Sequence, residues 1–371
     1  MTYISDISIL NIPFFYLVII ICSTVTCIYI GVFLAPIIGL VEKPSNCKKH
    51  ESIIPLVGGI ALFFGLLPTL FLLENSIPHQ ERFWLASLFI LFIGVWDDRV
   101  GLSIRKRFVI EILIAFMITA DGGLTVMSLG NIFGFGEIEL GLFAVPFTII
   151  CIVGVINALN MVDGIDGLTA GLSLVSMFAM LYLAIKVGRN AEAQMILMII
   201  SALIPIFIYN SRIFGQKSAR FFMGDGGSML LGLFLAWFTI SLSQTFTPNN
   251  EEQVFVAFPA VIALWLLSIP LIELFSSILR RLISGKNPFK SDVKHIHHLL
   301  ISAGFNANIT LIIIMGVATV MVAFTIIAFE AAIGDEILFI SILFVFAAFS
   351  IFSNVYWKKL DSQDKTKNIF Q

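Results

Sequence analysis

The sequence predicts an all-α, polytopic integral membrane protein, and its composition and its long apolar runs are the observations that predict it. Hydrophobic residues make up 58% of the 371 residues and charged residues only 12%, whereas soluble domains contain about 25% charged residues. Uncharged runs such as residues 61–73 recur along the whole chain. This composition excludes a soluble globular enzyme and a disordered protein. The net charge of −2 offers no basic surface, so no nucleic-acid partner is expected.

Eleven windows are long and apolar enough to be read as transmembrane helices, each of which needs about 20 mainly apolar residues. Several of them are short or contain glycine and proline. The first is not expected to be a cleavable signal, because no Lys or Arg precedes it and its apolar run is too long. Along the chain the windows lie near 13–34, 53–73, 82–96, 105–120, 141–157, 167–186, 194–209, 226–244, 254–279, 309–329 and 336–356.

The basic residues predict the orientation of these helices. All but three of the 22 Lys and Arg residues follow the first, third, seventh, ninth and eleventh windows, and the exceptions are Arg82, Lys186 and Arg189. Because cytoplasmic loops are enriched in Lys and Arg, this bias places the amino terminus outside and the carboxyl terminus in the cytoplasm. No internal repeat or soluble domain is evident, so residues 1–371 are predicted to be one transmembrane domain. Its site is expected in the cytoplasmic loops near 41–52, 97–107, 157–167, 210–225 and 280–308.

The first candidate site is the pair Asp97 and Asp98 at the inner end of the third window. Two adjacent carboxylates repel each other, which favours a bound proton or a cation. The pair is interpreted as a general base or a magnesium-associated site. A solvated helix end, with Arg99 next to it, is the alternative.

A second candidate follows the fifth window, where polar residues recur every three positions at Asn157, Asn160, Asp163 and Asp166. Residues three apart share a helix face, but the glycines beside the two aspartates make a tight turn equally compatible with the sequence. Hard cations such as Mg²⁺ take carboxylate and carbonyl oxygens as ligands. The alternative is a polar turn in which Asp166 caps the next helix.

Asp225 lies among glycines in residues 224–228, where the eighth window begins. Glycine lets backbone N–H groups approach a phosphate, and a helix N-terminus favours anions. An aspartate at this position is explained if a metal lies between it and the phosphate. A simple N-cap is the alternative.

Three histidines, His295, His297 and His298, lie in the fifth cytoplasmic loop. Their spacing lacks the HExxH pattern of zinc sites, and the other candidate ligands are Asp and Asn, which suit magnesium. We interpret them as donors to a phosphate or base; an ordinary loop cluster is the alternative.

Two acidic residues lie inside predicted spans, where a charge is costly. Glu111 follows Arg107 by four positions, which predicts an ion pair along one helix face. Glu273 lies in the ninth window, where a charged residue is interpreted as functional by default.

Together these residues resemble the polyprenyl-phosphate N-acetylhexosamine-1-phosphate transferase family, over about residues 43–304, and the span count and topology also match. The motifs are specific as a set: residues 55–60, 97–98, 157–168, 222–228 and 295–298. The last, with Arg280 and Arg281 before it, is similar to the bacterial branch that uses UDP-N-acetylglucosamine (UDP-GlcNAc) and undecaprenyl phosphate. The branch that makes the lipid-linked muramyl-pentapeptide precursor has a different histidine pattern and ranks second. Cys47 stands where the family usually has an arginine.

The resemblance implies an enzyme of the bacterial cytoplasmic (inner) membrane with its active site on the cytoplasmic face. It would transfer GlcNAc-1-phosphate from UDP-GlcNAc to undecaprenyl phosphate and release UMP, using Mg²⁺ or alternatively Mn²⁺. Membrane lipid surrounds such a protein. The resemblance leaves open whether the protein forms a homodimer and whether the reaction passes through a covalent intermediate. It also leaves open which cell-surface polymer the product begins. The competing class is a transporter of an anionic lipid or solute. It is disfavoured because the acids gather on one face and no repeat is evident.

The resemblance also implies a role for each residue that matches a family motif. The expected catalytic residues are Asp97, Asp98, Asp163 and Asp166, and the expected metal ligands are Asp225 and Asn160. The expected substrate-binding residues offer hydrogen-bond donors or a glycine backbone, and they are Arg107, Asn157, Arg281, His295, His297, His298, Gly58 and Gly59.

Overall fold

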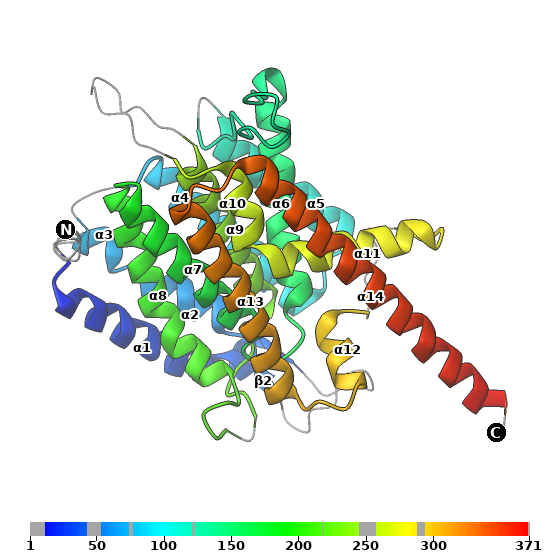
Figure 1. Cartoon of the computed structure of the whole chain (residues 1–371). Coiled ribbons are helices and arrows are strands. Elements are labelled where there is room, and N and C mark those ends of the chain that lie inside the picture. Colours follow the sequence, from blue (N-terminus) through cyan, green and yellow to red (C-terminus); the bar gives the residue numbers. More distant parts are fainter. Residues whose placement is uncertain are drawn as a thin grey trace.

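The computed structural model describes residues 12–42, 53–73, 77–120, 123–216, 218–244, 257–287 and 294–369, with the backbone alone for 361–369. These residues are mainly helical, with longer non-helical stretches at 123–140, 211–216 and 218–223 (Figure 1). The helices of the first half are α1 (Phe14–Ile38), α2 (Gly58–Leu66), α3 (Thr69–Leu72), α4 (Gln80–Val100), α5 (Ile104–Thr119), the 3-10 turn η3 (Gly141–Phe143) and α6 (Ala144–Val162). Those of the second half are α7 (Leu168–Lys186), α8 (Asn190–Asn210), α9 (Gly224–Ser243), α10 (Ala260–Leu266), α11 (Ser268–Ile283), α12 (Ile296–Ser302), α13 (Ala307–Glu330) and α14 (Asp335–Ile369).

Seven helices in the described ranges are long and apolar enough to cross a membrane: α1, α6 with η3, α7, α8, α9, α13 and α14. The pair α10 and α11, bent by 84° at its break, makes an eighth if it is one span. The windows near 53–73, 82–96 and 105–120 are helical too, but α2, α3 and α5 are short and α4 carries charges at both ends. The all-α, multi-pass membrane fold is therefore confirmed, whereas the count of eleven spans is not.

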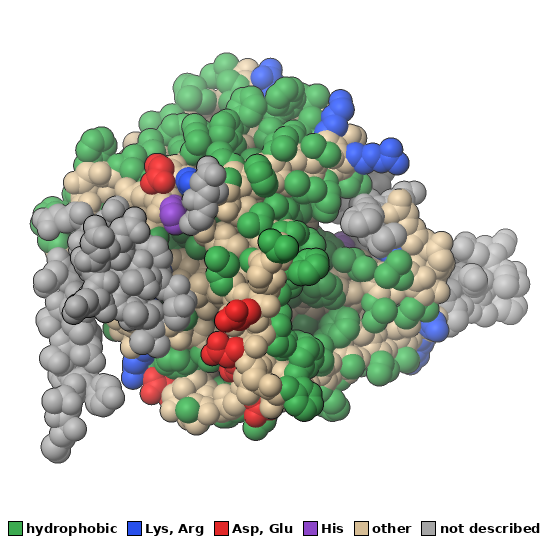
Figure 2. Space-filling view, turned by 90° about the horizontal axis from the view of Figure 1, so that it is seen from above, with side chains coloured by type: hydrophobic (Ala, Val, Ile, Leu, Met, Phe, Trp, Pro, Cys, Tyr) green, Lys and Arg blue, Asp and Glu red, His purple; other side chains and the backbone are tan. Residues whose placement is uncertain are grey.

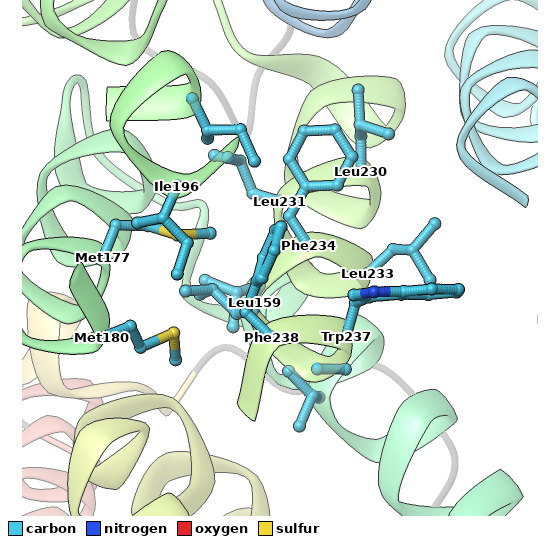
Figure 3. Packing of buried hydrophobic residues seen from close by; sticks show 14 of the residues in the cluster. Leu159, Met177, Met180, Ile196, Leu230, Leu231, Leu233, Phe234, Trp237 and Phe238 are labelled. Atoms are coloured by element: carbon cyan, nitrogen blue, oxygen red, sulfur yellow. The ribbon is translucent and has the colours of Figure 1, made fainter. Parts of the chain in front are cut away.

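Helix α9 lies at the centre of the bundle and contacts α2, α4, α6, α7 and α10. Its end residues Asp225 and Ser243 are the two residues of α9 that are not fully buried. Figure 3 shows the aromatic side chains of α9 among residues of α6, α7 and α8. Phe83 of α4 stacks on Phe234 with ring centroids 5.0 Å apart and meets Trp237 edge-on at 5.2 Å. Because lipid is as apolar as these side chains, close packing rather than escape from water stabilises this arrangement.

The start of α9 is tied to a small sheet. Strands β1 (Val41–Glu42) and β2 (Ile54–Pro55) pair antiparallel, with Val41 opposite Pro55. The chain entering α9 then joins the sheet, since the Phe222 N–H donates to the Pro55 carbonyl at 2.8 Å and the Gly58 N–H donates to the Phe222 carbonyl at 3.2 Å. These bonds fix the position at which α9 begins relative to the start of α2.

Two glycines allow neighbouring helices to touch the backbone of α9. A Cβ atom on Gly59 of α2 would lie 2.5 Å from the backbone carbon of Gly226, and one on Gly94 of α4 would lie 2.3 Å from the Gly226 Cα. Backbone atoms cannot move aside as a flexible side chain can. The first turn of α9 is thus enclosed on two sides by helices that approach as closely as glycine permits.

The opposite end of the bundle carries a separate polar network. Arg189 and Glu192 form a buried ion pair at the start of α8, and both reach Ser241 of α9. The Gln244 side chain accepts from the Met127 N–H at 2.8 Å, which ties residues 123–140 to the end of α9. Figure 2 looks onto this end, away from α12 and β2, and shows acidic side chains grouped among hydrophobic ones.

The glycine contacts generate a prediction. Gly59→Ala should lower the stability of the protein by about 1–3 kcal/mol, the usual cost of overpacking. Gly154→Ala in α6 is the matched control, because nothing lies within 4 Å of the new Cβ and alanine favours a helix. Apparent Tm values measured in one detergent would compare them. Equal Tm values for Gly59→Ala and the wild type would show that α2 can move away from α9.

Candidate active site

The carboxylate of Asp98, in the last turn of α4, caps the N-terminus of α9. Its two oxygens accept hydrogen bonds from the backbone N–H groups of Asp225 at 2.8 Å and Gly226 at 3.2 Å. Gly224, with φ +69°, begins the helix, and a Cβ atom there would lie 2.6 Å from the Asp98 carboxylate. A carboxylate at this position both satisfies otherwise unpaired donors and interacts favourably with the helix dipole.

Asp97 holds the turn between α4 and α5. It is 9% exposed, so the alternative of a solvated helix end does not apply to it. One oxygen accepts from the Leu102 N–H at 2.6 Å, and the other lies 3.2 Å from Nη1 of Arg107. Gly101, at φ +73°, ends α4 and lets the chain turn back. The two neighbouring aspartates thus face different partners.

The guanidinium of Arg107 joins four helices. Besides Asp97 of α4, it lies 3.4 Å from the Asn157 side-chain oxygen of α6 and 3.9 Å from an Asp225 oxygen of α9. On its own helix, α5, it lies 3.5 Å from Glu111, which confirms the predicted pair. Asn157 in turn donates to Glu111. We call Asp97, Arg107, Glu111, Asn157 and Asp225 the Arg107 cluster.

Asn160, one helical turn after Asn157, supports the side chain of Asp225. Its amide nitrogen donates to an Asp225 oxygen at 2.7 Å and to the Ser228 hydroxyl at 3.0 Å. The Asp225 side chain is 37% exposed, against 8% for Asp97. Asp225 is therefore the carboxylate of the cluster that remains most open to a ligand.

The polar segment after α6 is partly helix and partly turn. Asn157 and Asn160 lie on α6, which ends at Val162, and residues 163–167 form a turn before α7. Gly167, at φ +83°, is the N-cap of α7, so Asp166 is not the cap. Asp166 instead pairs with Arg212.

Asp163, in the same turn, accepts from the Thr169 hydroxyl at 2.8 Å. Burial and the nearby Asp225 raise the pKa of Asp98 to about 8, and the charge of Asp163 adds to this rise. The turn therefore belongs to the same electrostatic environment as the cap of α9.

Residues 294–302, here called the histidine segment, lie against this turn. A Cβ atom on Gly164 would be 2.1 Å from Nε2 of His297, so only glycine lets the ring lie over the turn. The ring centroids of His297 and His298 are 4.2 Å apart. His297 is 2% exposed, and its Nδ1 has no partner among the described residues. Burial, together with the nearby His298 and His295, lowers the pKa of His297 to about 3, so this imidazole is neutral near pH 7.

The other predicted substrate-binding residues have mainly structural partners. Arg281, 9% exposed, donates to the Asn287 carbonyl at 3.0 Å. Gly58 and Gly59 are buried against the residues that begin α9, from Met223 to Gly227. Cys47 and most of the first predicted cytoplasmic loop, residues 41–52, lie outside the described residues.

The donor atoms around Asp225 fit a hard divalent cation. They are the carboxylate oxygens of Asp225, which Mg²⁺ prefers, whereas Asn160 presents its amide nitrogen to this carboxylate. Mg²⁺ is usually held by one or two carboxylates plus phosphates and waters. No group of three or more His, Cys, Asp or Glu side chains stands at metal-binding geometry in the described part of the chain. A site built from Asp225 and substrate phosphates fits both observations.

Sequence reasoning missed several partners because they come from distant parts of the chain. Arg212 and Thr169 hold the two aspartates of the turn, yet neither belongs to a conspicuous motif. Glu273 lies 3.3 Å from Nδ1 of His295. An acidic residue within an apolar window needs a partner, and this signal could have predicted that Glu273 contacts a basic residue such as His295.

Comparisons of the sequence with those of known proteins identify its family. The model of glycosyl transferase family 4 matches residues 82–243, which contain the whole Arg107 cluster. The undecaprenyl-phosphate alpha-N-acetylglucosaminyl 1-phosphate transferase of Yersinia pestis is 34% identical to this chain, over 82% of this chain and 79% of its own length. This chain belongs to the polyprenyl-phosphate N-acetylhexosamine-1-phosphate transferase family.

Two further relatives with the same name support this membership. Those of Escherichia coli (strain K12) and Haemophilus influenzae are 32% and 36% identical to this chain. Each alignment covers 86% of this chain, with 85% and 88% of the relative. The similarity to this transferase family therefore extends over most of the chain, well beyond the stretch matched by the family model.

The burial of His297 gives a pH prediction. In the unfolded chain its pKa is near the ordinary 6.5, whereas folding lowers it. Below about pH 6.5 the unfolded state therefore takes up a proton that the folded state does not, and stability falls as the pH drops toward the folded pKa. One such proton contributes at most about 1.4 kcal/mol per pH unit.

The measurement is the apparent Tm of wild type and His297→Gln between about pH 7 and pH 5, above the range where most carboxylates titrate. The variant should lose less stability over this interval. His298, whose pKa burial also lowers, should leave some slope in the variant. Parallel curves for the two proteins would mean that His297 is accessible to protons in the folded state.

Proposed function

We propose that this protein transfers GlcNAc-1-phosphate from UDP-GlcNAc to undecaprenyl phosphate, giving GlcNAc-pyrophosphoryl-undecaprenol and UMP. The observation that carries the proposal is that the Arg107 guanidinium joins Asp97, Asn157 and Asp225 from three other helices. The names of the relatives support the choice of donor and acceptor.

The reaction needs positioning and charge neutralisation more than a strong base. A non-bridging oxygen of the lipid phosphate attacks the β-phosphorus, the bond from that phosphorus to the bridging oxygen breaks, and UMP leaves. A phosphate monoester is already largely ionised near pH 7. In phosphoryl transfer, fixed cations and hydrogen-bond donors supply most of the catalysis.

The residues divide between the two substrates in this proposal. Arg107 and Asn157 face the lipid phosphate, because a guanidinium binds phosphate through paired donors. The histidine segment and Arg281 face the UDP-sugar. Asp98 acts by holding the first turn of α9, and Asp97 by holding Arg107.

Electrostatics support a bound divalent cation. Four carboxylates, from Asp97, Asp98, Glu111 and Asp225, surround the Arg107 side chain or the start of α9, and the substrates bring further negative charge. Mg²⁺, held by Asp225 with Asn160 beside it, would neutralise the phosphates; Mn²⁺ would suit the same oxygen atoms. Asp163 supports the same site from the turn after α6.

The proposed topology has eleven spans, with the amino terminus outside and the carboxyl terminus inside the bacterial inner membrane. The seven long helices and the bent pair α10–α11 are completed by α2–α3, α4 and α5. The bias of Lys and Arg supports this orientation. It places the Arg107 cluster at the cytoplasmic edge, where a lipid phosphate and a soluble nucleotide sugar meet.

The deciding experiment measures UMP release by the purified protein from UDP-GlcNAc and undecaprenyl phosphate with Mg²⁺. Release should require both substrates, and Asp225→Asn should abolish it while the protein remains monodisperse. UDP-muramyl-pentapeptide in place of UDP-GlcNAc should give little UMP. Faster UMP release with UDP-muramyl-pentapeptide would assign the protein to the muramyl-pentapeptide branch of the family. Absence of UMP release with both donors would refute the proposed enzymatic function.

The two neighbouring aspartates give a kinetic prediction. Asp98→Asn leaves one oxygen for two backbone donors, and Asp97→Asn weakens the hold on Arg107. Both should lower kcat about tenfold or more, since losing one helix cap or charged partner costs about 1–2 kcal/mol. KM for UDP-GlcNAc should change less.

Glu330→Gln is the control for the aspartate variants. It removes a carboxylate that pairs with Lys186 at 2.9 Å on α7, away from the Arg107 cluster, and should leave kcat unchanged. Higher KM for UDP-GlcNAc with normal kcat in both aspartate variants would instead assign Asp97 and Asp98 to the nucleotide sugar.

A further inference from the structure

Glu273 and His295 form a buried pair that connects α11 to the histidine segment. Nδ1 of His295 lies 3.3 Å from an oxygen of Glu273, and the residues are 6% and 4% exposed. Glu273 lies on α11, in the apolar window of the bent pair, where an unpaired carboxylate is costly. The roles assigned above do not use this glutamate.

We propose that Glu273 is a positioning residue that fixes the tautomer and ring orientation of His295, and through it the place of His297; this rests on the function proposed above. A carboxylate next to Nδ1 keeps the proton on that nitrogen and leaves the lone pair on Nε2. The same arrangement orients histidines in metal sites and catalytic triads. His295 then presents one defined face to the rest of the segment.

His295 passes this constraint to the turn after α6. Its ring stacks on that of His297, with centroids 5.7 Å apart and an interplanar angle of 22°. His297 lies over Gly164, and Gly164 stands between Asp163 and Asp166 in the sequence. A continuous set of contacts therefore runs from helix α11 to the turn after α6, which contains Asp163 and Asp166.

The backbone of the histidine segment has a separate anchor. Arg280 donates to the Lys294 carbonyl at 2.7 Å, and the Lys294 ammonium lies 5.5 Å from the centre of the Trp357 ring of α14. The backbone is thus held next to α11 and α14 without help from Glu273. Loss of Glu273 should release the His295 ring while the segment stays in place.

A double-mutant cycle tests the proposal, with kcat and both KM values measured for Glu273→Ala, His295→Ala and the double variant. Glu273→Ala should lower kcat/KM for UDP-GlcNAc about 10-fold to 100-fold, as the loss of orienting partners does elsewhere. KM for undecaprenyl phosphate should not change. If Glu273 acts only through His295, the double variant should equal His295→Ala.

Additive losses in this cycle would overturn the proposal, because they would show that Glu273 acts on something other than His295. Equal loss of affinity for both substrates would overturn it as well, since that result indicates a general structural defect. Ser276→Ala is the matched control. Ser276 lies on α11, as Glu273 does, and the change removes its 2.7 Å contact with Ser350 of α14. Both KM values and kcat should stay unchanged.

Conservative variants cover the case in which Glu273→Ala does not fold. Glu273→Gln keeps an oxygen that can accept from Nδ1 of His295 and should therefore retain most of the activity. Glu273→Asp moves the carboxylate away from His295 by one methylene group and should have low activity. The cycle is then run with Glu273→Asp. Less activity in Glu273→Gln than in Glu273→Asp would contradict positioning through a hydrogen bond. Absence of UMP release by the wild type would instead refute the proposed function itself.

Discussion

The capped and enclosed start of α9 is the constraint on which the rest of the site depends. Asp98 binds the backbone of the first turn, and Gly59 and Gly94 let two helices touch it directly. Asp225 is the side chain of this turn that reaches outward. Its position is therefore set by backbone contacts from α2 and α4, which are stiffer than contacts between side chains. Such rigid placement is what charge stabilisation in phosphoryl transfer requires.

Around this fixed point, single polar side chains connect helices that are far apart in sequence. Arg107 joins α5 to α4, α6 and α9, and Asn160 joins α6 to α9. Each contact satisfies a charge or donor that would be costly to leave unpaired near a membrane. The same contacts that assemble the site therefore also hold the bundle together at this end, so that a variant of Arg107 is expected to affect both activity and stability.

The sequence predicted the helical membrane fold, but it did not predict the partners of most candidate site residues. Apolar windows located every long helix, because twenty uncharged residues have few other structures available. Asp225 and Asn160, seen in sequence as separate motifs, do lie in contact. The sequence could not reveal that Asp98 faces the backbone of α9, or that His297 lies over Gly164. Such pairings depend on how the helices pack, and packing is not encoded in the spacing of one segment.

The burial of α9 has a consequence for how the protein is made. Of the seven long apolar helices in the described ranges, α9 is the least apolar, and its side chains meet protein on all sides. It therefore gains little by entering lipid alone and depends on neighbours that are already in the membrane. Its main neighbours α4 and α6 precede it in the chain and are synthesised first. Assembly of the Arg107 cluster and stable membrane insertion of α9 are then one event in biogenesis, which precedes the synthesis of the histidine segment.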